Sequence, residues 1–380
     1  MESISEFSIS SSILYEQLGY LYKVINNRPL VAILEDFLFE IKDNKLTITA
    51  SDLQTTMISN IRLDQYSSDI QIAIPAKILL ETIKNLPDQS ILFQVHEKNN
   101  IILKANSGEY SLVGENAKHY PKDKLENEQN SYIVNGPILK EILQCTLPFA
   151  SHDSIKPVIN SVLFDFIENH PTFVSTDVMR LVKFEHNEIQ ISQSSRFIVP
   201  KKSLQLLFPI LNNDIYIQVF DNKVAFSNDN MTLISNLINE KYPNYENAIP
   251  NNNNNRVCIS TNDLISTLKR LCIYTNDITH QVNFNISNNI ITITAEDPRY
   301  EKSAIERLSC ICECDTNEIM VSFNARLLLE LLQNCNYDEI MFYISNPDMN
   351  GKVNKAVIIR PSEPKDNQDI LFLIMPIFSN

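Results

Sequence analysis

The sequence predicts an α+β fold built from three repeats of about 125 residues. The first observation is an alternating strand that ends at an Asp, which occurs three times, at Asp52, Asp177 and Asp297, spaced 125 and 120 positions apart. The second is a helix-like segment that opens each unit and another that follows each Asp. The third is a strand pair that closes each unit. Strand and helix signals that recur at a fixed spacing indicate a repeat architecture.

The strands before each Asp form a predicted hairpin. Alternating apolar and polar residues run up to the Asp, and short turns rich in Asn, Asp and His separate each run from the strand before it. The first strands lie at 36–45, 161–170 and 281–289, and the second at 46–50, 172–176 and 291–295. The closing strand pairs are expected at 90–105, 214–227 and 339–360.

Helices are predicted from apolar residues at helical spacing. Pro75 and Pro200 suit a first helical turn, where the missing N–H costs nothing. Ser260 or Thr261 can cap the helix that follows. The six predicted helical segments are 11–28, 74–86, 135–151, 199–211, 260–275 and 321–335.

The joints between repeats fall in polar stretches, at 126–130 and at the Asn tract 251–255. Low-complexity Asn is typical of a linker. We therefore expect three domains, at 1–128, 129–253 and 254–380.

Composition places the chain among ordinary globular proteins, with 44% apolar and 21% charged residues. No run approaches the ~20 apolar residues of a membrane span, and the N-terminus lacks the pattern of a secretory signal. Seven Cys is an odd number. These features predict a cytoplasmic protein with reduced thiols and no membrane partner.

Motifs for cofactors and catalysis are missing from the sequence. The five Gly form no phosphate-binding loop, and no Ser/His/Asp or Cys/His order stands out. Cys310, Cys312 and Cys314 would share one face of a strand. A structural zinc site requires four ligands, and only three thiols lie together here. We therefore interpret these thiols as packing residues, with a metal site as the weaker alternative. No cofactor is predicted.

Five segments resemble the bacterial DNA polymerase III β subunit, the sliding clamp. They are "NNRPLVAILEDFLFEI" (26–41), "STDVMRL" (175–181), "EKYPNYENAIP" (240–250), "FNARLLLELL" (323–332) and the terminal "LIMPIFSN". The resemblance covers the whole chain. Two positions depart from the family pattern, because Ala32 replaces a proline and Val178 replaces a glycine.

The resemblance implies the DNA-clamp fold, with two helices and two antiparallel four-stranded sheets in each domain. Two chains would join head to tail as a homodimeric ring that encircles duplex DNA without reading its sequence. The protein would catalyse nothing. It would act as a processivity factor that tethers the polymerase, and the clamp loader and repair proteins would bind it through short linear motifs.

The resemblance also places two protein-binding surfaces. At the subunit contact, Tyr110 and Leu112 would lie opposite Ile273 and Tyr274. A groove between domains two and three would hold partner peptides, and its Leu, Met, Pro and Ile side chains suit apolar anchors. The groove residues are Thr176, Val178, Met179, Arg180, Leu181, Pro250, Leu373, Met375, Pro376 and Ile377.

The net charge of −14 argues against nucleic acid at first sight. However, the six predicted helical segments carry ten Lys or Arg and five acidic residues, so their net charge is +5 and the remainder carries −19. Helices that line a hole would therefore present a mildly basic wall to phosphates. The expected DNA contacts are Arg28, Lys84, Lys140, Lys201, Lys202 and Lys269.

Two other classes of function remain. One is a hydrolase that uses Asp52, Asp177 and Asp297 with Arg180, although Arg180 has no Arg at the equivalent places in the other repeats. The other is a repeat scaffold without a DNA role, which the basic helices disfavour.

Overall fold

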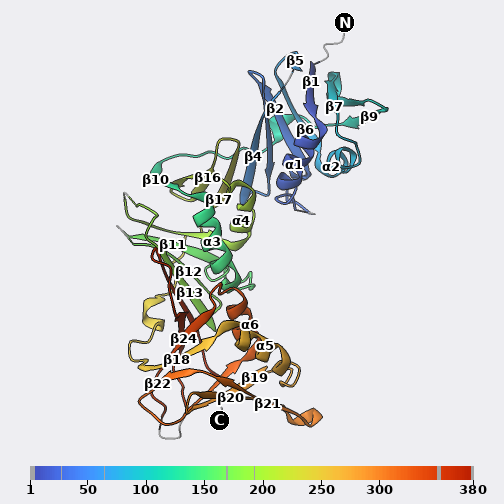
Figure 1. Ribbon diagram of the computed structural model, residues 1–380. Helices are drawn as coiled ribbons and strands as arrows, with labels where there is room; N and C mark the ends of the chain where they lie inside the picture. Colours follow the sequence, from blue (N-terminus) through green and yellow to red (C-terminus); the bar gives the residue numbers. More distant parts are fainter. Residues whose placement is uncertain are drawn as a thin grey trace. The chain divides into compact units, whose positions relative to one another are not determined.

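The structure, a computed structural model, describes residues 5–26, 28–63, 65–167, 170–191, 193–348 and 352–377. The chain forms two compact units. Unit one comprises Met1–Leu139 and Lys202–Leu237, and unit two comprises Lys140–Lys201 and Ile238–Asn380. The middle repeat therefore contributes to both units, and Figure 1 shows the elements of each.

Unit one contains two antiparallel sheets, with strand orders β5-β1-β7-β8-β9 and β10-β15-β16-β17-β4-β3-β2-β6. The five-stranded sheet consists of β1 (Ser5–Ser10), β5 (Gln65–Tyr66), β7 (Ser90–Val95), β8 (Asn100–Ala105) and β9 (Gly108–Val113). The eight-stranded sheet consists of β2 (Asp36–Lys42), β3 (Lys45–Ser51), β4 (Thr55–Arg62), β6 (Ile70–Pro75), β10 (Glu128–Val134), β15 (Ile215–Phe220), β16 (Lys223–Ser227) and β17 (Met231–Asn236).

Unit two also contains two antiparallel sheets, with strand orders β14-β11-β12-β13-β26-β25-β24-β18-β22 and β21-β20-β19-β23. The nine-stranded sheet consists of β11 (Ser161–Ile167), β12 (His170–Thr176), β13 (Arg180–His186), β14 (Ser195–Pro200), β18 (Asn255–Ser260), β22 (Ile311–Glu313), β24 (Glu339–Ile344), β25 (Val357–Pro361) and β26 (Gln368–Ile374). The four-stranded sheet consists of β19 (Gln281–Ser287), β20 (Ile290–Asp297), β21 (Lys302–Ser309) and β23 (Ile319–Asn324).

The two large sheets arise because consecutive repeats share a ladder. In unit one, β4 of the first repeat pairs with β17 of the second, with Met57 opposite Leu233. In unit two, β13 of the second repeat pairs with β26 of the third, with Val182 opposite Phe372. The expected separate four-stranded sheets are therefore joined in pairs. In each join, the strand that follows an Asp turn pairs with the last strand of the next repeat.

The six predicted helical segments each contain a helix, but the helices are shorter than expected. They are α1 (Ser11–Leu21), α2 (Ala76–Lys84), α3 (Gly136–Thr146), α4 (Lys201–Gln205), α5 (Thr261–Leu271) and α6 (Ala325–Gln333). Pro75 and Pro200 are the last residues of the preceding strands. Ser260 caps α5, since its side chain accepts a hydrogen bond from the Asp263 N–H at 3.3 Å. The α1/α2 and α5/α6 pairs lie side by side (Figure 1).

Hairpin turns in the first and third repeats follow the predicted pattern. Asp43 and Asn44 both have left-handed backbone angles, as do Asn288 and Asn289. Two such residues between strands form the turn whose twist matches the sheet. In the second repeat the corresponding residues 168–169 lie outside the described part of the chain.

The two faces of the β13–β26 ladder divide the core of unit two. On one face Leu181, Leu371 and Leu373 belong to a single buried cluster. Val182, Phe184 and Phe372 alternate with them along the same strands and are buried on the other face. Among the helices of the described residues, none has the length and apolar character needed to cross a membrane.

Candidate functional site

The turn at Asp177 is closed by its own carboxylate. Asp177 Oδ1 accepts hydrogen bonds from the N–H groups of Met179 at 3.0 Å and Arg180 at 2.7 Å. The Thr176 hydroxyl donates to the Arg180 carbonyl at 2.6 Å and accepts from the Val178 N–H at 3.0 Å. Val178 is held at φ 80°, a left-handed conformation that disfavours a β-branched residue. The glycine of the family pattern would adopt this conformation without strain.

The turn at Asp52 repeats this geometry. Asp52 Oδ1 accepts from the N–H groups of Gln54 at 3.0 Å and Thr55 at 2.7 Å. Leu53 occupies the left-handed position with φ 73°. The repeated Asp is therefore a backbone-closing residue in both turns, which explains its recurrence without catalysis.

The turn at Asp297 differs. Pro298–Tyr300 form a short 3-10 helix, and Asp297 Oδ1 accepts from the Arg299 N–H at 3.2 Å. Asp297 Oδ2 is buried, and no described residue donates a hydrogen bond to it. Glu301 takes the left-handed position at φ 53°. Two extra residues thus separate the Asp from the strand that follows.

Arg180 ties the Asp177 turn to helix α6. Its side chain is 5% exposed and donates from Nη2 to Asp177 Oδ2 at 2.8 Å. Nη1 donates to Glu330 Oε2 at 3.0 Å and to the Leu327 carbonyl at 3.2 Å. The guanidinium also lies 5.3 Å from the centroid of the Phe149 ring. All these partners belong to unit two, so Arg180 links the Asp177 turn to helix α6 and to Phe149.

A largely buried apolar cluster lies beside this turn. Leu181, Leu373 and Met375 pack in one cluster. The other buried members are Leu163, Val174, Ile198, Tyr242, Tyr245, Ala356, Ile358 and Leu371. The Met375 N–H donates to the Met179 carbonyl at 2.8 Å, which fixes the chain end beside the turn. The structure therefore brings the two predicted walls of the groove together.

The remaining predicted groove residues take different positions. Val178 is 65% exposed, and Met179 is also exposed at the rim. Pro250 is half-buried next to Ile249, which packs against the cluster, and Pro376 is buried. Ile377 leaves the groove, because its N–H donates to the Ser322 carbonyl at 2.8 Å and its side chain lines another cavity.

The sequence prediction missed several residues of this apolar cluster. Tyr242, Tyr245 and Ile249 lie in the segment "EKYPNYENAIP", whose alternating aromatic and polar residues were a usable signal. Val158 and Tyr343 also pack against the cluster. Burial raises the pKa of Tyr242 and Tyr245 above the ordinary range, so both phenols stay neutral.

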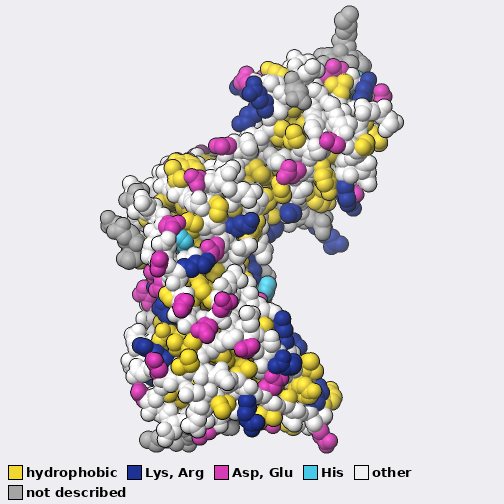
Figure 2. Space-filling model, in the orientation of Figure 1, with side chains coloured by type: hydrophobic (Ala, Val, Ile, Leu, Met, Phe, Trp, Pro, Cys, Tyr) yellow, Lys and Arg dark blue, Asp and Glu magenta, His cyan; other side chains and the backbone are white. Residues whose placement is uncertain are grey.

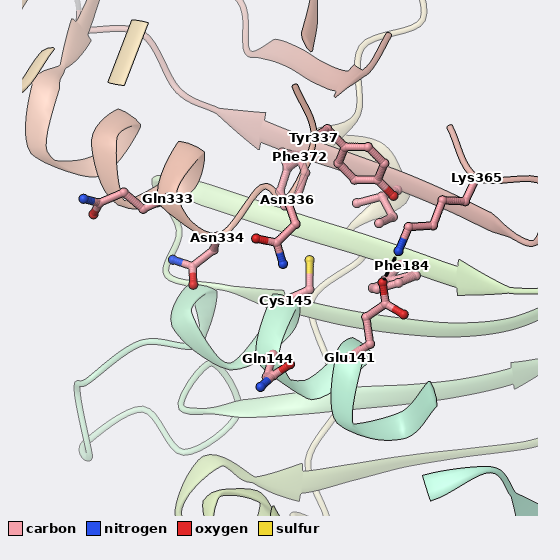
Figure 3. A pocket seen from close by; sticks show the side chains of 11 residues that line it. Glu141, Gln144, Cys145, Phe184, Gln333, Asn334, Asn336, Tyr337, Lys365 and Phe372 are labelled. Atoms are coloured by element: carbon pink, nitrogen blue, oxygen red, sulfur yellow. Dashed lines mark hydrogen bonds and ion pairs between the residues drawn. The ribbon is translucent and has the colours of Figure 1, made fainter. Parts of the chain in front are cut away.

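The opposite face of the same sheet borders a cavity of about 310 Å³ (Figure 3). Lys365 Nζ donates to Glu141 Oε1 at 2.6 Å at one end. Burial raises the pKa of Glu141, but hydrogen bonds from Lys365 and Gln368 outweigh it, so the pKa is lowered. The predicted groove residues do not line this cavity.

The predicted DNA-binding residues fall into two groups. Lys201 is 7% exposed, and its ammonium donates to the Ala150 carbonyl at 2.7 Å. Burial lowers its pKa. Phosphates cannot reach this side chain, so the assignment of Lys201 to the DNA surface is corrected. Lys202 is half-exposed, but its Nζ lies 2.5 Å from Asp52 Oδ2 and 3.1 Å from Asn26 Oδ1.

The other predicted cations are accessible. Arg28, Lys84 and Lys269 are exposed, and Lys140 is half-buried. Lys84 lies 3.8 Å from Glu81, a weak surface pair. Figure 2 shows Lys and Arg side chains gathered over the region of α5 in unit two, where Lys269 is exposed.

The residues predicted for the subunit contact lie on an edge strand or next to a helix that packs on an edge strand. Tyr110 and Leu112 belong to β9, the edge strand of the five-stranded sheet in unit one. Ile273 and Tyr274 follow the end of α5 in unit two and are exposed. Helix α5 packs on β21, the edge strand of the four-stranded sheet, and Arg270 Nε donates to Glu306 Oε1 at 2.8 Å.

All seven thiols are free. The Sγ atoms of Cys310 and Cys312 are 3.3 Å apart, and Cys314 Sγ lies 3.8 Å from the Arg256 carbonyl oxygen. Burial raises the pKa of Cys310 to about 12. Within the described ranges, no group of three or more His, Cys, Asp or Glu is arranged to hold a metal ion.

Family models match nearly the entire chain. The N-terminal, central and C-terminal domain models of the DNA polymerase III beta subunit match residues 5–125, 134–244 and 246–377. The beta sliding clamp of Halalkalibacterium halodurans is 24% identical, over 98% of this chain and 99% of the relative. That of Haemophilus influenzae is 25% identical, over 86% of this chain and 89% of the relative.

Solved structures share the fold. A Pseudomonas aeruginosa DNA polymerase III subunit beta bound to griselimycin superposes with a TM-score of 0.92 at 20% identity, covering 99% of this chain and 100% of that chain. A Bacillus subtilis sliding clamp gives 0.89 at 21% identity with complete coverage of both chains. The hydrolase and scaffold alternatives are therefore not favoured. The chain belongs to the DNA polymerase III beta subunit family, the β sliding clamps, which are non-catalytic processivity factors of DNA polymerase.

Proposed function

We propose that this processivity factor is a cytoplasmic homodimer that closes as a ring around duplex DNA and tethers partner proteins at the Asp177 groove. Its three clamp domains would be residues 1–128, 129–253 and 254–380. One observation carries the proposal. Each internal join pairs the strand after an Asp turn with the last strand of the next repeat. Among the described residues, the strand after the third Asp turn has no such partner, because β21 is an edge strand of its sheet.

The same rule identifies the surfaces that a second copy would complete. The strand after the third Asp turn is β21, and the last strand of the first repeat is β9. Both are edge strands of their sheets. An edge strand offers unpaired backbone groups to another chain. We therefore pair β21 of one copy with β9 of the next.

The internal joins also give the register of this pairing. Three residues are equivalent in the strands after the Asp turns: Met57, Val182 and Ala304. Each lies opposite the residue two positions before the Asp, which is Ala50, Ser175 or Ala295. In the two internal joins, Met57 pairs with Leu233 and Val182 pairs with Phe372. In the closing hairpins, Tyr110 pairs with Leu103 as Leu233 pairs with Phe226 and Phe372 pairs with Ile359, so Tyr110 is the equivalent of Leu233 and Phe372. Tyr110 of one copy would therefore lie opposite Ala304 of the other.

Neighbouring pairs follow from this register. Leu112 would lie opposite Lys302, on the same face as Tyr110 and on the α5 side, near Ile273 and Tyr274. On the other face Ser111 would lie opposite Ser303, and Glu109 would be diagonal to Arg307, within reach of a long side chain. Burial of Tyr110, Leu112, Ile273 and Tyr274 would contribute roughly 1.5–3 kcal/mol for each large apolar side chain.

Sedimentation tests the dimer. The parent chain is expected to sediment as a dimer at low micromolar concentration, and the double variant Ile273→Ala with Tyr274→Ala as a monomer. Ile278→Ala is the matched control, because this exposed residue follows the same helix but lies outside the proposed contact. An intact dimer in the double variant would reject this interface.

The groove proposal rests on the cluster of Leu181, Leu373 and Met375. This cluster offers apolar anchoring and a Met that adapts to different side chains. Such a surface suits the short linear motifs of polymerase, loader and repair proteins. Thr176 and Arg180 would hold the surface in place, while Val178 and Met179 form its exposed rim.

For DNA, we propose contacts from Arg28, Lys84, Lys140, Lys202 and Lys269, without Lys201. Lys140→Ala with Lys269→Ala should weaken DNA association equally on different sequences. The salt dependence should flatten by roughly one unit for each lost phosphate contact. An unchanged salt slope, measured by titration at several salt concentrations, would exclude these two contacts.

A further inference from the structure

A second cavity, of about 650 Å³, lies against one face of the four-stranded sheet in unit two. Strands β19, β20 and β23 form its floor, and residues 352–354 and Ile377 border it. We call this cavity the trough. It is separate from the apolar cluster of the groove, and the sequence prediction did not identify it.

The floor of the trough is built from amide and hydroxyl side chains. Asn283 and Asn285 alternate with the buried Phe284 along β19 and therefore share the exposed face. Their cross-strand neighbours on β20 are Thr294 and Thr292. Such side chains can both donate and accept hydrogen bonds. The floor thus suits a ligand rich in amide groups.

Two amides in this floor have unused hydrogen-bonding capacity. Asn285 Nδ2 donates to Glu318 Oε1 at 2.7 Å, but Asn285 Oδ1 is buried and accepts from no described residue. Asn283 Oδ1 accepts from Gln281 Nε2 and Ser322 Oγ, both at 2.7 Å. Its Nδ2 group donates to no described residue. A buried acceptor without a donor requires an explanation, and a ligand N–H would supply the donor once the Asn285 side chain turns toward the trough.

The spacing of these groups matches a polypeptide backbone. Residues two apart in a strand are separated by about 6.6–6.8 Å, which is also the repeat of an extended peptide. A peptide lying along β19 would therefore present a carbonyl to Asn283 and an N–H to Asn285. Recognition of this kind reads the backbone and tolerates different side chains.

The C-terminal segment connects the groove to the trough. Met375 is fixed beside the Asp177 turn, and two residues later the Ile377 N–H donates to the Ser322 carbonyl at 2.8 Å, with its side chain in the trough. We infer that the trough binds the extended stretch that flanks a partner's linear motif, through the amides of Asn283 and Asn285. This inference rests on the proposed groove, which would bind the motif itself.

Peptide binding to the full-length protein tests this inference. The probes are a short peptide with a Gln/Leu/Phe motif and two longer peptides, one extended by six residues at the N-terminus and one at the C-terminus. Fluorescence anisotropy should show tighter binding for one extended peptide than for the short one. Asn285→Ala, or Asn283→Ala, should remove about three- to tenfold of that gain, as expected for a lost hydrogen bond.

Controls separate this inference from the groove proposal. Ser287→Ala on the same face of β19 lies outside the trough and should leave all affinities unchanged. Met375→Ala should weaken the short and extended peptides alike, and failure there would reject the groove. If Met375→Ala weakens binding while neither extension adds affinity, or while both Asn variants keep the full gain, the trough assignment is overturned.

Discussion

The two internal joins share one backbone and differ in side chains. In unit one the Asn236 N–H donates to the Gln54 carbonyl at 2.9 Å. In unit two the Met375 N–H makes the equivalent bond to the Met179 carbonyl at 2.8 Å. The Asn236 side chain then donates to Gln54 Oε1 at 3.1 Å, whereas the Met375 side chain packs on the apolar cluster.

This comparison distinguishes the features that hold the repeats together from those that form the proposed peptide groove. The Asp turn and the shared ladder hold consecutive repeats together in both units. At the positions of Leu181 and Met375, unit one has the polar residues Thr56 and Asn236. Ile234 matches Leu373 and packs in a smaller apolar cluster. A peptide groove therefore requires a change of only a few side chains on a repeated backbone. The predictions below compare equivalent positions in the two units.

The largest effect is expected from the cation that supports each turn. Arg180→Ala leaves the Asp177 carboxylate without its buried partner and should lower the free energy of unfolding by about 3–5 kcal/mol. Lys202→Ala removes a half-exposed ammonium from the Asp52 carboxylate, whose side chain is 3% exposed, and should cost less, about 1–3 kcal/mol, because water can occupy the vacated position. Urea unfolding measures both. Equal losses would show that the two joins are supported alike.

Met375→Ala tests the groove itself. Loss of a central apolar anchor should weaken binding of a polymerase-tail peptide by about 2 kcal/mol or more, at least tenfold. Asn236→Ala, at the matching position in unit one, should leave the affinity unchanged. Fluorescence anisotropy gives both values, and equal affinities in the two variants would place the groove elsewhere.

Asp36 should make stability depend on pH. Burial, with Glu115 and Glu35 nearby, raises the pKa of Asp36 to about 7. A carboxyl whose pKa is raised on folding is most favourable when protonated. Its stabilising contribution is therefore complete below about pH 4 and is lost as the pH rises through about 7.

Ser161 holds the equivalent position in unit two, since Asp36 and Ser161 pair with Pro75 and Pro200. Asp36→Ser should raise the free energy of unfolding at pH 8, relative to its effect at pH 4, by about 1–2 kcal/mol. Glu35→Gln, at an exposed neighbour, should change it much less. Parallel pH profiles for parent and Asp36→Ser, from urea unfolding, would contradict the shifted pKa.

The smallest effect is expected at the left-handed turn positions. An L-residue there costs about 1–2 kcal/mol, and part of this is offset because glycine gains more freedom when unfolded. Val178→Gly should stabilise by less than about 1 kcal/mol and Leu53→Gly by less still, because Val is β-branched. Calorimetry that found both variants less stable would show that neither turn is strained.

Local patterns predicted much of the fold. Residue periodicity located the helices and hairpins, and Ser260, one of the two predicted cap candidates, caps α5. Joining of the sheets was not predictable, because β4·β17 and β13·β26 link residues far apart in sequence. Lys201 and Lys202 looked alike, but adjacent residues of a helix point in different directions, so only Lys202 reaches solvent.

Cross-linking at the predicted register tests the central claim, that a second copy completes the third join as the chain completes the first two. In Ser111→Cys with Ser303→Cys, the Cβ atoms of opposing residues would be about 4.5–5.5 Å apart, within reach of a disulfide after slight adjustment. Ser111→Cys with Ser309→Cys is the control, because Ser309 lies six residues further along β21. Mild oxidation followed by non-reducing electrophoresis should give a band at twice the chain mass for the first variant only. A monomer band alone, or cross-linking of the Ser309 control in preference to Ser303, would contradict the account.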